Sequence, residues 1–496
     1  MTETNSRASA GPPTDGPTTD VPRRSWHALV VLLLGMFMAL LDTTIVNVAL
    51  PTIETSLEAS EATLSWIISG YALAFGLALI PAGKVGDRIG HKWVFFAGLA
   101  LFTVASLACG LAQNDLQLVV ARVVQGLAGG IFVPAVTAFI QLLFPGSVRG
   151  KAFAIMGAVI GVSTALGPIV GGLIIEVFGD ENGWRGVFWV NLPIGLVGLA
   201  AAAFLLPSRS EVETRSAAGI DWVGLVLITA GLVALLVPLI EGQDQGWPLW
   251  TYISLAGSVV LIAAFAAWEL RFTKRGHNPL VPPKLFAHPA FTGGVILALV
   301  YFAAFTSIFF TLSLMWQSGL GNSALATGVV TLPFAIGSII ASSQSAKLTE
   351  RLGRTVLLLG TSLVAISLIW LWVLLSTTDA ADLTNWKLLA PLLIGGLGNG
   401  AFIAPNAQFI VATVDRQDAG AASGVISTMQ RIGSAVGIAV IGSVLFASLN
   451  ITGPDTVATG FTHAASVAMS VSAAFAVVAL LLVFALPKRA SASAEH

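Results

Sequence analysis

Long apolar stretches recur along the whole chain and are separated by short polar connections. Each stretch extends for about 18 residues or more, which lets an α-helix cross a hydrocarbon core of roughly 30 Å. The pattern therefore predicts an all-α integral membrane protein. Its fourteen expected spans begin near Trp26, Thr63, Trp93, Leu116, Ala152, Val187, Trp222, Leu249, Phe291, Ala324, Thr355, Leu388, Gly420 and Phe461.

The composition agrees with a membrane protein, because 56% of the residues are hydrophobic and only 10% are charged. Cys109 is the single cysteine, which excludes an intrachain disulfide and a Cys-rich metal site. Residues 1–25 are rich in Pro, Gly and Thr near their start, and we expect them to form a disordered cytoplasmic tail. The first apolar segment has no small-residue cleavage site, so we expect it to be retained as a helix.

The basic residues indicate the orientation of the chain. Of the 24 lysines and arginines, all but four fall in the tails or in predicted connections on one side of the membrane. Arg185 and Lys387 fall on the opposite side, and Arg122 and Arg431 lie within predicted helices. Since cytoplasmic loops carry the excess of positive charge, both termini are expected in the cytoplasm, which requires an even number of spans.

Two similar polar hairpins indicate an internal repeat. Residues 83–92 and 346–354 both read small-Lys-x-x-acid-Arg-aliphatic-Gly and are followed by a basic residue. Their alignment predicts two six-helix bundles, 26–207 and 289–487, an inserted segment 208–288 with two spans, and a cytoplasmic tail 488–496. Two related halves around a midplane site are typical of transporters.

Asp42 is the one acidic residue that the pattern places well inside a span. A carboxylate at the bilayer centre costs roughly 2.5–3.5 kcal/mol or more, so it is seldom kept without a role. Asp42 can change its charge by taking up one proton, as a proton-driven pump needs. The alternative is a structural ion pair with an arginine that only holds two helices together. Arg122 and Arg431 keep their protons and act as fixed charges, and Arg431 either lines a cavity or caps the cytoplasmic end of its helix.

Five motifs resemble those of the major facilitator superfamily. Residues 83–92 resemble its motif A, Leu118-x3-Arg122-x2-Gln125-Gly126 resembles motif B, and residues 167–172 resemble motif C, which marks antiporters. Residues 41–51 and 184–193 resemble signatures of the fourteen-helix drug:proton antiporters of the EmrB/QacA type. His91 replaces the usual arginine of motif A, and Gly186 replaces a tryptophan. The resemblance implies a major facilitator fold with six, two and six helices.

The resemblance also implies roles for motifs A and C. In motif A (Gly83, Asp87, Arg88, Gly90, Lys92), Asp87 is expected to meet a helix N-terminus of the other half and to close the cytoplasmic side. The positive-inside bias alone would explain Lys84, Arg88 and Lys92, but it does not explain Asp87. Motif C (Gly167, Pro168, Gly171, Gly172) would seal the cavity against proton leak, or simply allow close helix packing.

The central cavity of this family is lined by helices that carry several candidate residues here. We expect Asn47 and Gln125 to offer hydrogen bonds near Asp42, and Arg122 to tune its proton affinity. In the second half the candidates are Tyr301, Phe305, Phe309, Asn399, Phe402 and Asn406, with Arg431 as a further one. The aromatic stripe has helix packing as its alternative explanation. Few polar groups accompany these residues, which favours an amphipathic or aromatic substrate.

The chain is expected to be a transporter rather than an enzyme. It has no Gly-x4-Gly-Lys-Ser/Thr loop and no metal-ligand spacing, so we expect no cofactor and a proton gradient as the energy source. The leading function is proton-coupled efflux of small molecules such as drugs or antibiotics from a bacterial cytoplasmic (inner) membrane, by a monomer without a nucleic-acid partner. The alternatives are a dedicated exporter of one antibiotic, siderophore or amino acid, and a lipid-handling or scaffold protein.

Overall fold

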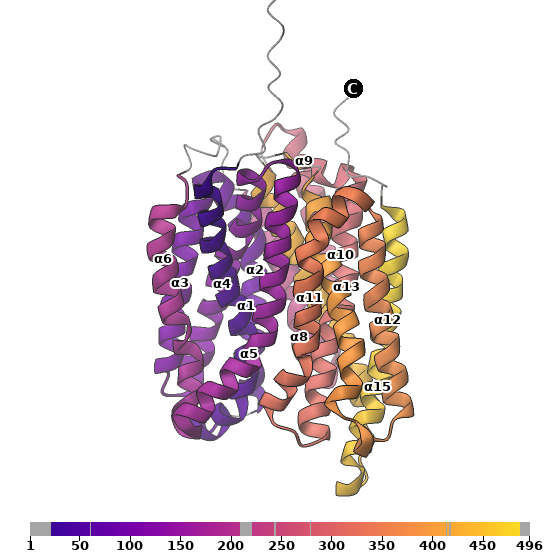
Figure 1. Ribbon diagram of the computed structural model, residues 1–496. Helices are drawn as coiled ribbons and strands as arrows, with labels where there is room; N and C mark the ends of the chain where they lie inside the picture. The colour runs from indigo at the N-terminus through magenta and orange to yellow at the C-terminus, as the bar shows by residue number, and fades with distance from the viewer. Residues whose placement is uncertain are drawn as a thin grey trace, which may run out of the picture.

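The computed structural model describes residues 21–59, 61–208, 221–242, 245–277, 279–412, 414–415 and 418–486. Within these ranges the chain is helical and contains no β-strand, which confirms the all-α class. The long helices stand side by side as one bundle (Figure 1). Residues 1–20 of the expected N-terminal tail, the expected tail 488–496 and the connecting residues 209–220 lie outside the described residues.

The long helices agree with the predicted spans. They are α1 Arg23–Leu57, α2 Glu61–Ile89, α3 His91–Leu111, α4 Asp115–Leu143, α5 Gly146–Trp189, α6 Asn191–Leu205, α8 Trp222–Glu241, α9 Leu249–Lys274, α10 Pro289–Leu314, α11 Ala324–Leu352, α12 Thr355–Thr377, α13 Asn385–Val411, α14 Ala419–Ala447 and α15 Val457–Ala485. Among the described residues, thirteen helical segments are long and apolar enough to cross a membrane. Helix α2 contains two further segments, Trp66–Leu79 and Pro81–Ile89, with a bend of 45° between them. Counted as one, they give a fourteenth span.

The fifth and sixth spans meet at a glycine turn. Gly179 has φ 78° and ψ 166°, a backbone conformation that glycine adopts without steric cost. The fifth span therefore ends there, and the sixth begins at Asn182, earlier than the predicted start at Val187. Arg185 consequently lies inside this span, where its Nη1 donates hydrogen bonds to the carbonyls of Gly110 and Ala112 at 2.9 and 2.6 Å. These bonds satisfy carbonyls at the end of α3 that have no partner within the helix.

The two halves of the chain lie beside each other. Figure 1 shows α1 to α6, coloured indigo to magenta, on one side and α11, α12, α13 and α15, coloured orange to yellow, on the other. Across the boundary α5 packs on α11, and α2 packs on α14. α8 and α9 pack mainly on each other, and α8 also contacts α2 and α14. The division into 26–207, 208–288 and 289–487 stays a prediction.

The same close helix approach occurs in both halves. In the first half, a side chain at Gly126 or Gly130 of α4 would collide with the backbone of α2. In the second half, a side chain at Gly396 or Gly400 of α13 would collide with the backbone of α11. The carbonyl oxygens concerned belong to Tyr71, Phe75, Phe334 and Ser338. The repeated packing supports the internal repeat that the two hairpins indicate.

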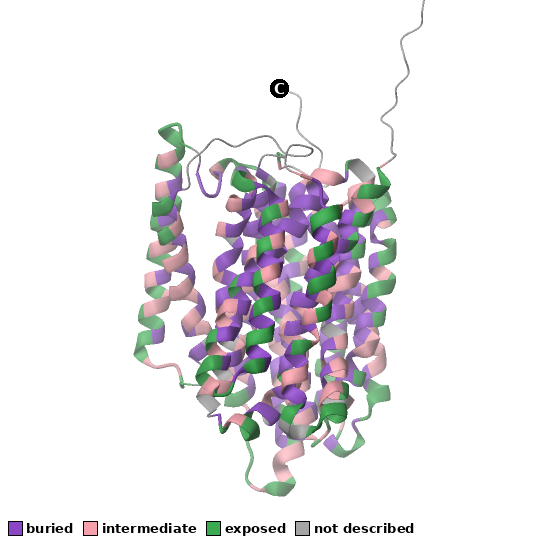
Figure 2. Cartoon of the chain, turned by 90° about the vertical axis from the view of Figure 1, so that its left-hand side faces the viewer, coloured by how far each residue is buried: buried purple, intermediate pink, exposed green. Residues whose placement is uncertain are grey.

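Burial follows the pattern expected of a bundle in lipid. Figure 2 shows buried residues along the interior faces of the helices and exposed residues mainly on the outside. Many of the exposed side chains are large and apolar, such as Phe204, Val226, Val259 and Leu481. In water such a surface would be unfavourable, whereas hydrocarbon tails solvate it without cost.

Candidate functional site

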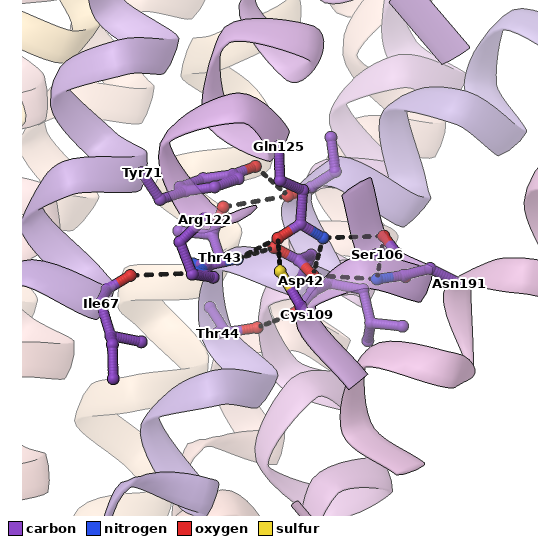
Figure 3. Close-up of polar contacts among 12 residues, drawn as sticks. Asp42, Thr43, Thr44, Ile67, Tyr71, Ser106, Cys109, Arg122, Gln125 and Asn191 are labelled. Atoms are coloured by element: carbon purple, nitrogen blue, oxygen red, sulfur yellow. Dashed lines mark hydrogen bonds and ion pairs between the residues drawn. The ribbon is translucent and has the colours of Figure 1, made fainter. Parts of the chain in front are cut away.

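A buried ion pair lies inside the first half. The Nη1 atom of Arg122 on α4 is 2.6 Å from Oδ2 of Asp42 on α1. The two residues are only 1% and 0% exposed. Figure 3 shows them at the centre of a network of polar side chains from several helices. The sequence placed both charges at membrane depth, and the structure brings them into direct contact, so each neutralises the other.

The second oxygen of Asp42 accepts hydrogen bonds from two amides. Gln125 Nε2 and Asn191 Nδ2 each donate to Oδ1 at 2.9 Å. Both amides also donate to the hydroxyl oxygen of Ser106, at 2.8 and 3.3 Å. Asp42 is therefore surrounded by donors alone in this network (Figure 3). A proton added to the carboxylate would face N–H groups and would require them to rearrange.

Asn191 and Ser106 carry no sequence signal that pointed to a role in this site. Asn191 lies in the signature 184–193, but a neutral amide in an apolar helix is a weaker signal than a charge. Its Oδ1 atom is buried and has no hydrogen-bond partner among the described residues. Asn191 begins α6, so this network joins α1, α3, α4 and α6.

Arg122 has further contacts that do not depend on Asp42. Its Nε donates to the carbonyl of Ile67 at 3.0 Å, and its Nη1 donates to Oε1 of Gln125 at 2.6 Å. The guanidinium carbon lies 4.2 Å from the centre of the Tyr71 ring, a cation–π contact. The Tyr71 hydroxyl donates to the carbonyl of Ala39 at 3.2 Å. These contacts would hold the guanidinium in place when Asp42 is neutral.

Asn47 does not take part in this network. It is exposed and forms no hydrogen bond to Asp42. Five residues along an α-helix correspond to a rotation of roughly 140°, which turns Asn47 away from the carboxylate. The expected hydrogen bond from Asn47 is therefore wrong, and Asn191 occupies that position. Whether Asn47 lines a cavity stays a prediction.

Motif A contacts the other half of the molecule. The backbone N–H groups of Gly420 and Ala421, at the start of α14, donate to the two carboxylate oxygens of Asp87 at 3.0 and 3.2 Å. Nε2 of His91 lies 3.3 Å from the same carboxylate. The first N–H groups of a helix lack partners within it and carry partial positive charge, so a carboxylate fits there. A side chain at Gly83 would collide with the carbonyl of Gly420, so the hairpin needs glycine at this contact.

The remaining motif A residues have local contacts. Gly90 has φ 102°, which favours glycine at the turn between α2 and α3. Lys92 donates to the carbonyls of Ala203 and Leu206 at 2.8 Å each and so caps the end of α6. Arg88 is exposed at the end of α2.

A second ionic contact lies close to the start of α14. Nζ of Lys284, in the short helix η1 (Pro283–Ala287), is 3.0 Å from Asp415 and 2.7 Å from Asp418. Partial burial alone would lower the pKa of Lys284, but its hydrogen bonds to Asp418 and Asp415 outweigh this effect and raise the pKa. The ammonium group therefore stays charged and holds η1 against the segment before α14.

Motif C lies against α1. A side chain at Gly167 would collide with Thr44, and a side chain at Gly171 would lie 2.9 Å from Ile45. Pro168 lies against α11 of the other half. Its Cβ is 3.1 Å from the point where a Cβ at Gly328 would stand. Gly172 is partly buried on the same helix. The contacts show close helix packing, and a role in preventing proton leak stays a prediction.

The aromatic candidates of the second half form one cluster. The Tyr301 ring stacks on Phe402 with 3.7 Å between centroids, and its hydroxyl donates to Oδ1 of Asn399 at 2.8 Å. Phe305 and Phe309 continue the cluster, together with Phe334, which the sequence analysis did not single out. Tyr301 and Phe402 are each only 1% exposed. In this conformation the cluster is packed rather than open, as the packing alternative expects.

Two other candidates lie apart from this cluster. Asn406 is buried and donates to the carbonyl of Gly294 at 3.2 Å. Arg431 lies about three turns beyond Ala419, the first residue of α14, so it does not cap that helix. Its guanidinium carbon is 4.1 Å from the centre of the Phe75 ring on α2. Arg431 therefore faces the boundary between the halves.

The described residues provide no obvious metal site, because no three His, Cys, Asp or Glu side chains among them are grouped to hold an ion. The buried network of the first half instead contains one ion pair, Asp42 with Arg122, and the amides of Gln125 and Asn191 that donate to it.

The chain is similar to bacterial proteins that are named for the transport or export of particular compounds or for resistance to them. It is 35% identical to a probable actinorhodin transporter of Streptomyces coelicolor, over 92% of this chain and 78% of the relative. It is 33% identical to a tetracenomycin C resistance and export protein of Streptomyces glaucescens, over 88% and 79%. It is 34% identical to the puromycin resistance protein pur8 of Streptomyces alboniger, over 93% and 90%.

Solved structures share the fold at low identity. The proton:xylose symporter XylE, bound to 6-bromo-6-deoxy-D-glucose, superposes with a TM-score of 0.63 at 13% identity, covering 93% of this chain and 95% of the symporter. The sequence model of the Major Facilitator Superfamily matches this chain in two overlapping segments, residues 32–438 and 295–494. Since that model and relatives of about one-third identity cover most of the sequence, the chain is a multi-pass membrane protein that belongs to the major facilitator superfamily of transporters.

Proposed function

We propose that this protein is a proton-coupled efflux transporter of the fourteen-helix drug:proton antiporter type. The single observation that carries the coupling is the buried Asp42 carboxylate, which contacts Arg122, Gln125 and Asn191. The relatives that are named for antibiotic resistance or export support outward movement of small molecules. The positive-inside pattern supports a bacterial cytoplasmic membrane with the motif A hairpin on the cytoplasmic side.

The proposed mechanism begins with protonation of Asp42 from the outside. Protonation removes the charge that faces Arg122 and turns one acceptor oxygen into a donor, so the network must rearrange. In a partly desolvated site the attraction between such charges amounts to several kcal/mol, enough to shift an equilibrium between two conformations. Substrate that binds from the cytoplasm would then favour release of the proton on that side.

The cytoplasmic side has to open in this cycle. In the present structure Asp87 binds the start of α14, and further hydrogen bonds join the two halves. Gln141 of α4 donates to the carbonyl of Val414 at 3.1 Å, and Ser423 of α14 donates to the carbonyl of Pro134 at 2.7 Å. Loading from the cytoplasm would require these contacts to break together.

Inside-out vesicles from a bacterial host test this function. An imposed acid-inside gradient should drive uptake of hydrophobic aromatic drugs, and nigericin, which collapses the pH gradient, should stop it. The matched control is a vesicle that contains the Asp42→Asn protein. An efflux function would be contradicted if, for every compound of a diverse panel, vesicles with the wild-type protein took up no more than vesicles without it.

Export of one dedicated compound is the second candidate. It is favoured by relatives that are each named for a single compound, such as actinorhodin or tetracenomycin C. The same vesicle panel distinguishes the two functions, because a dedicated exporter would transport one chemical scaffold and leave unrelated drugs outside. We further propose that the transporter acts as a monomer with small molecules, protons and the bilayer as its partners.

A further inference from the structure

Arg431 is a second cation in the interior, and it lacks the neutralisation that Arg122 has. It is partly buried, about three turns into α14, and among the described residues it forms no ion pair and no hydrogen bond. Its observed partner is the ring of Phe75, 4.1 Å from the guanidinium carbon. A charged arginine at this depth is costly, and an aromatic face compensates only part of that cost.

The surroundings of Arg431 link it to the first half. The ring centroids of Tyr71 and Phe75, neighbours on α2, are 5.9 Å apart. Arg122 lies on the Tyr71 ring and Arg431 on the Phe75 ring, so the two guanidinium groups flank one pair of rings. Asp42 neutralises only Arg122, which leaves a net positive charge at the boundary between α2 and α14.

A second polar group without a partner lies close to Arg431 on the same helix. Thr428 precedes Arg431 by three residues, and residues with this spacing lie on one face of a helix. Thr428 is 3% exposed, and its hydroxyl has no hydrogen-bond partner among the described residues. A buried hydroxyl and a nearby cation together could bind an oxyanion through charge-assisted hydrogen bonds.

We propose that Arg431, with Thr428, binds the anionic group of the substrate, so that the transported compounds are amphipathic acids such as aromatic carboxylates or phenolates. The apolar part of such a compound would lie along the Phe75 side of the boundary, where the same guanidinium already contacts a ring. The inference rests on the proposed transport function and specifies its substrate class. Cationic compounds are disfavoured at this position, because Arg431 would repel them.

The test uses the purified full chain in lipid nanodiscs and three aromatic acids, each paired with its neutral carboxamide. The probes are 1-naphthoate, 9-anthracenecarboxylate and 1-pyrenebutyrate, and binding is followed by energy transfer from tryptophan. We expect at least one acid to bind roughly tenfold or more tightly than its amide, as a charge-assisted hydrogen bond allows. Arg431→Gln should reduce that ratio to about one, whereas Arg431→Lys should keep part of it.

Lys274→Gln is the matched control, because it removes an exposed cation at the end of α9. Its ratio should equal that of the wild type. Equal ratios for Arg431→Gln and wild type, or no binding of any acid by the wild-type chain, would overturn the inference. If Arg431→Gln does not fold, the comparison of acid with amide in the wild type and in Arg431→Lys still decides it. If vesicles take up neutral or cationic drugs but none of the acids, this inference is refuted and the transport function stands.

Discussion

Replacement of Asp42 by asparagine gives the sharpest test of proton coupling. The side chain keeps its size but can neither carry the negative charge nor take up a proton. Arg122 loses its ion-pair partner, and removal of one member of a buried pair usually costs about 3–5 kcal/mol. Here Arg122 keeps the Ile67 carbonyl, the Gln125 oxygen and the Tyr71 ring, so we expect a loss near the lower end of that range. The variant should still fold and insert.

The transport readout is the accumulation ratio in inside-out vesicles. A gradient of two pH units supports roughly a hundredfold accumulation for each proton exchanged, because about 1.4 kcal/mol corresponds to a factor of ten. The Asp42→Asn protein should show a ratio close to one, with substrate binding retained. In a weakly buffered solution of purified protein, added substrate should release protons from the wild type and not from the variant.

Glu54→Gln provides the matched control, because Glu54 is an exposed acid on the same helix. This control should retain both accumulation and proton release. If the Asp42→Asn protein retains both as well, Asp42 is only a structural partner of Arg122, and another group must carry the proton. A variant that loses both activities together with its folded state, as judged by thermal unfolding, would not count in favour of the mechanism.

Three further predictions concern the gate, motif C and the inserted pair. Asp87→Asn should slow transport strongly while substrate binding persists in detergent, because it removes the anion at the start of α14. Its control is Glu350→Gln, at the exposed counterpart in the second hairpin, which should transport normally. Gly167→Ala should destabilise the fold by about 1–3 kcal/mol in thermal or denaturant unfolding, because the added methyl group meets Thr44, and unchanged stability would contradict that packing. Cysteines placed at residues 225–237 of α8 should react slowly with water-soluble thiol reagents from either side, and labelling that substrate blocks would show that α8 lines the cavity.

The sequence predicted the fold well because lipid imposes strong constraints. Backbone groups in hydrocarbon must be satisfied within a helix, so each span requires a long apolar stretch. The break that ends the fifth span, at Gly179, depends on one residue with positive φ, and the sequence holds many glycines that remain helical. A glycine turn inside an apolar region therefore cannot be told from a packing glycine without the neighbouring helices.

The sequence identified Asp42, Arg122 and Gln125 of the candidate site, but it gave no sign of Asn191 or Ser106. Asp42 and Arg122 stood out because charges are rare at membrane depth. Asn191 and Ser106 resemble the many small polar residues that satisfy themselves within a helix, and their roles depend on contacts between helices. The contact of Arg431 with Phe75 joins two halves that are far apart in the sequence, so helical periodicity could not distinguish a cavity position from a cap.

The geometry of α2 connects the three places that a transport cycle has to coordinate. Tyr71 lies under Arg122 of the ion pair, Phe75 lies under Arg431, and Asp87 near the end of the helix binds the start of α14. The 45° bend at Pro81 separates the first two contacts from the third. Because one helix carries all three, a displacement of Tyr71 that follows protonation of Asp42 would also change the angle at which Asp87 meets α14. In the proposed mechanism, a proton on Asp42, beside the middle of α2, would thus influence the Asp87 contact near the end of that helix, although the two sites do not touch.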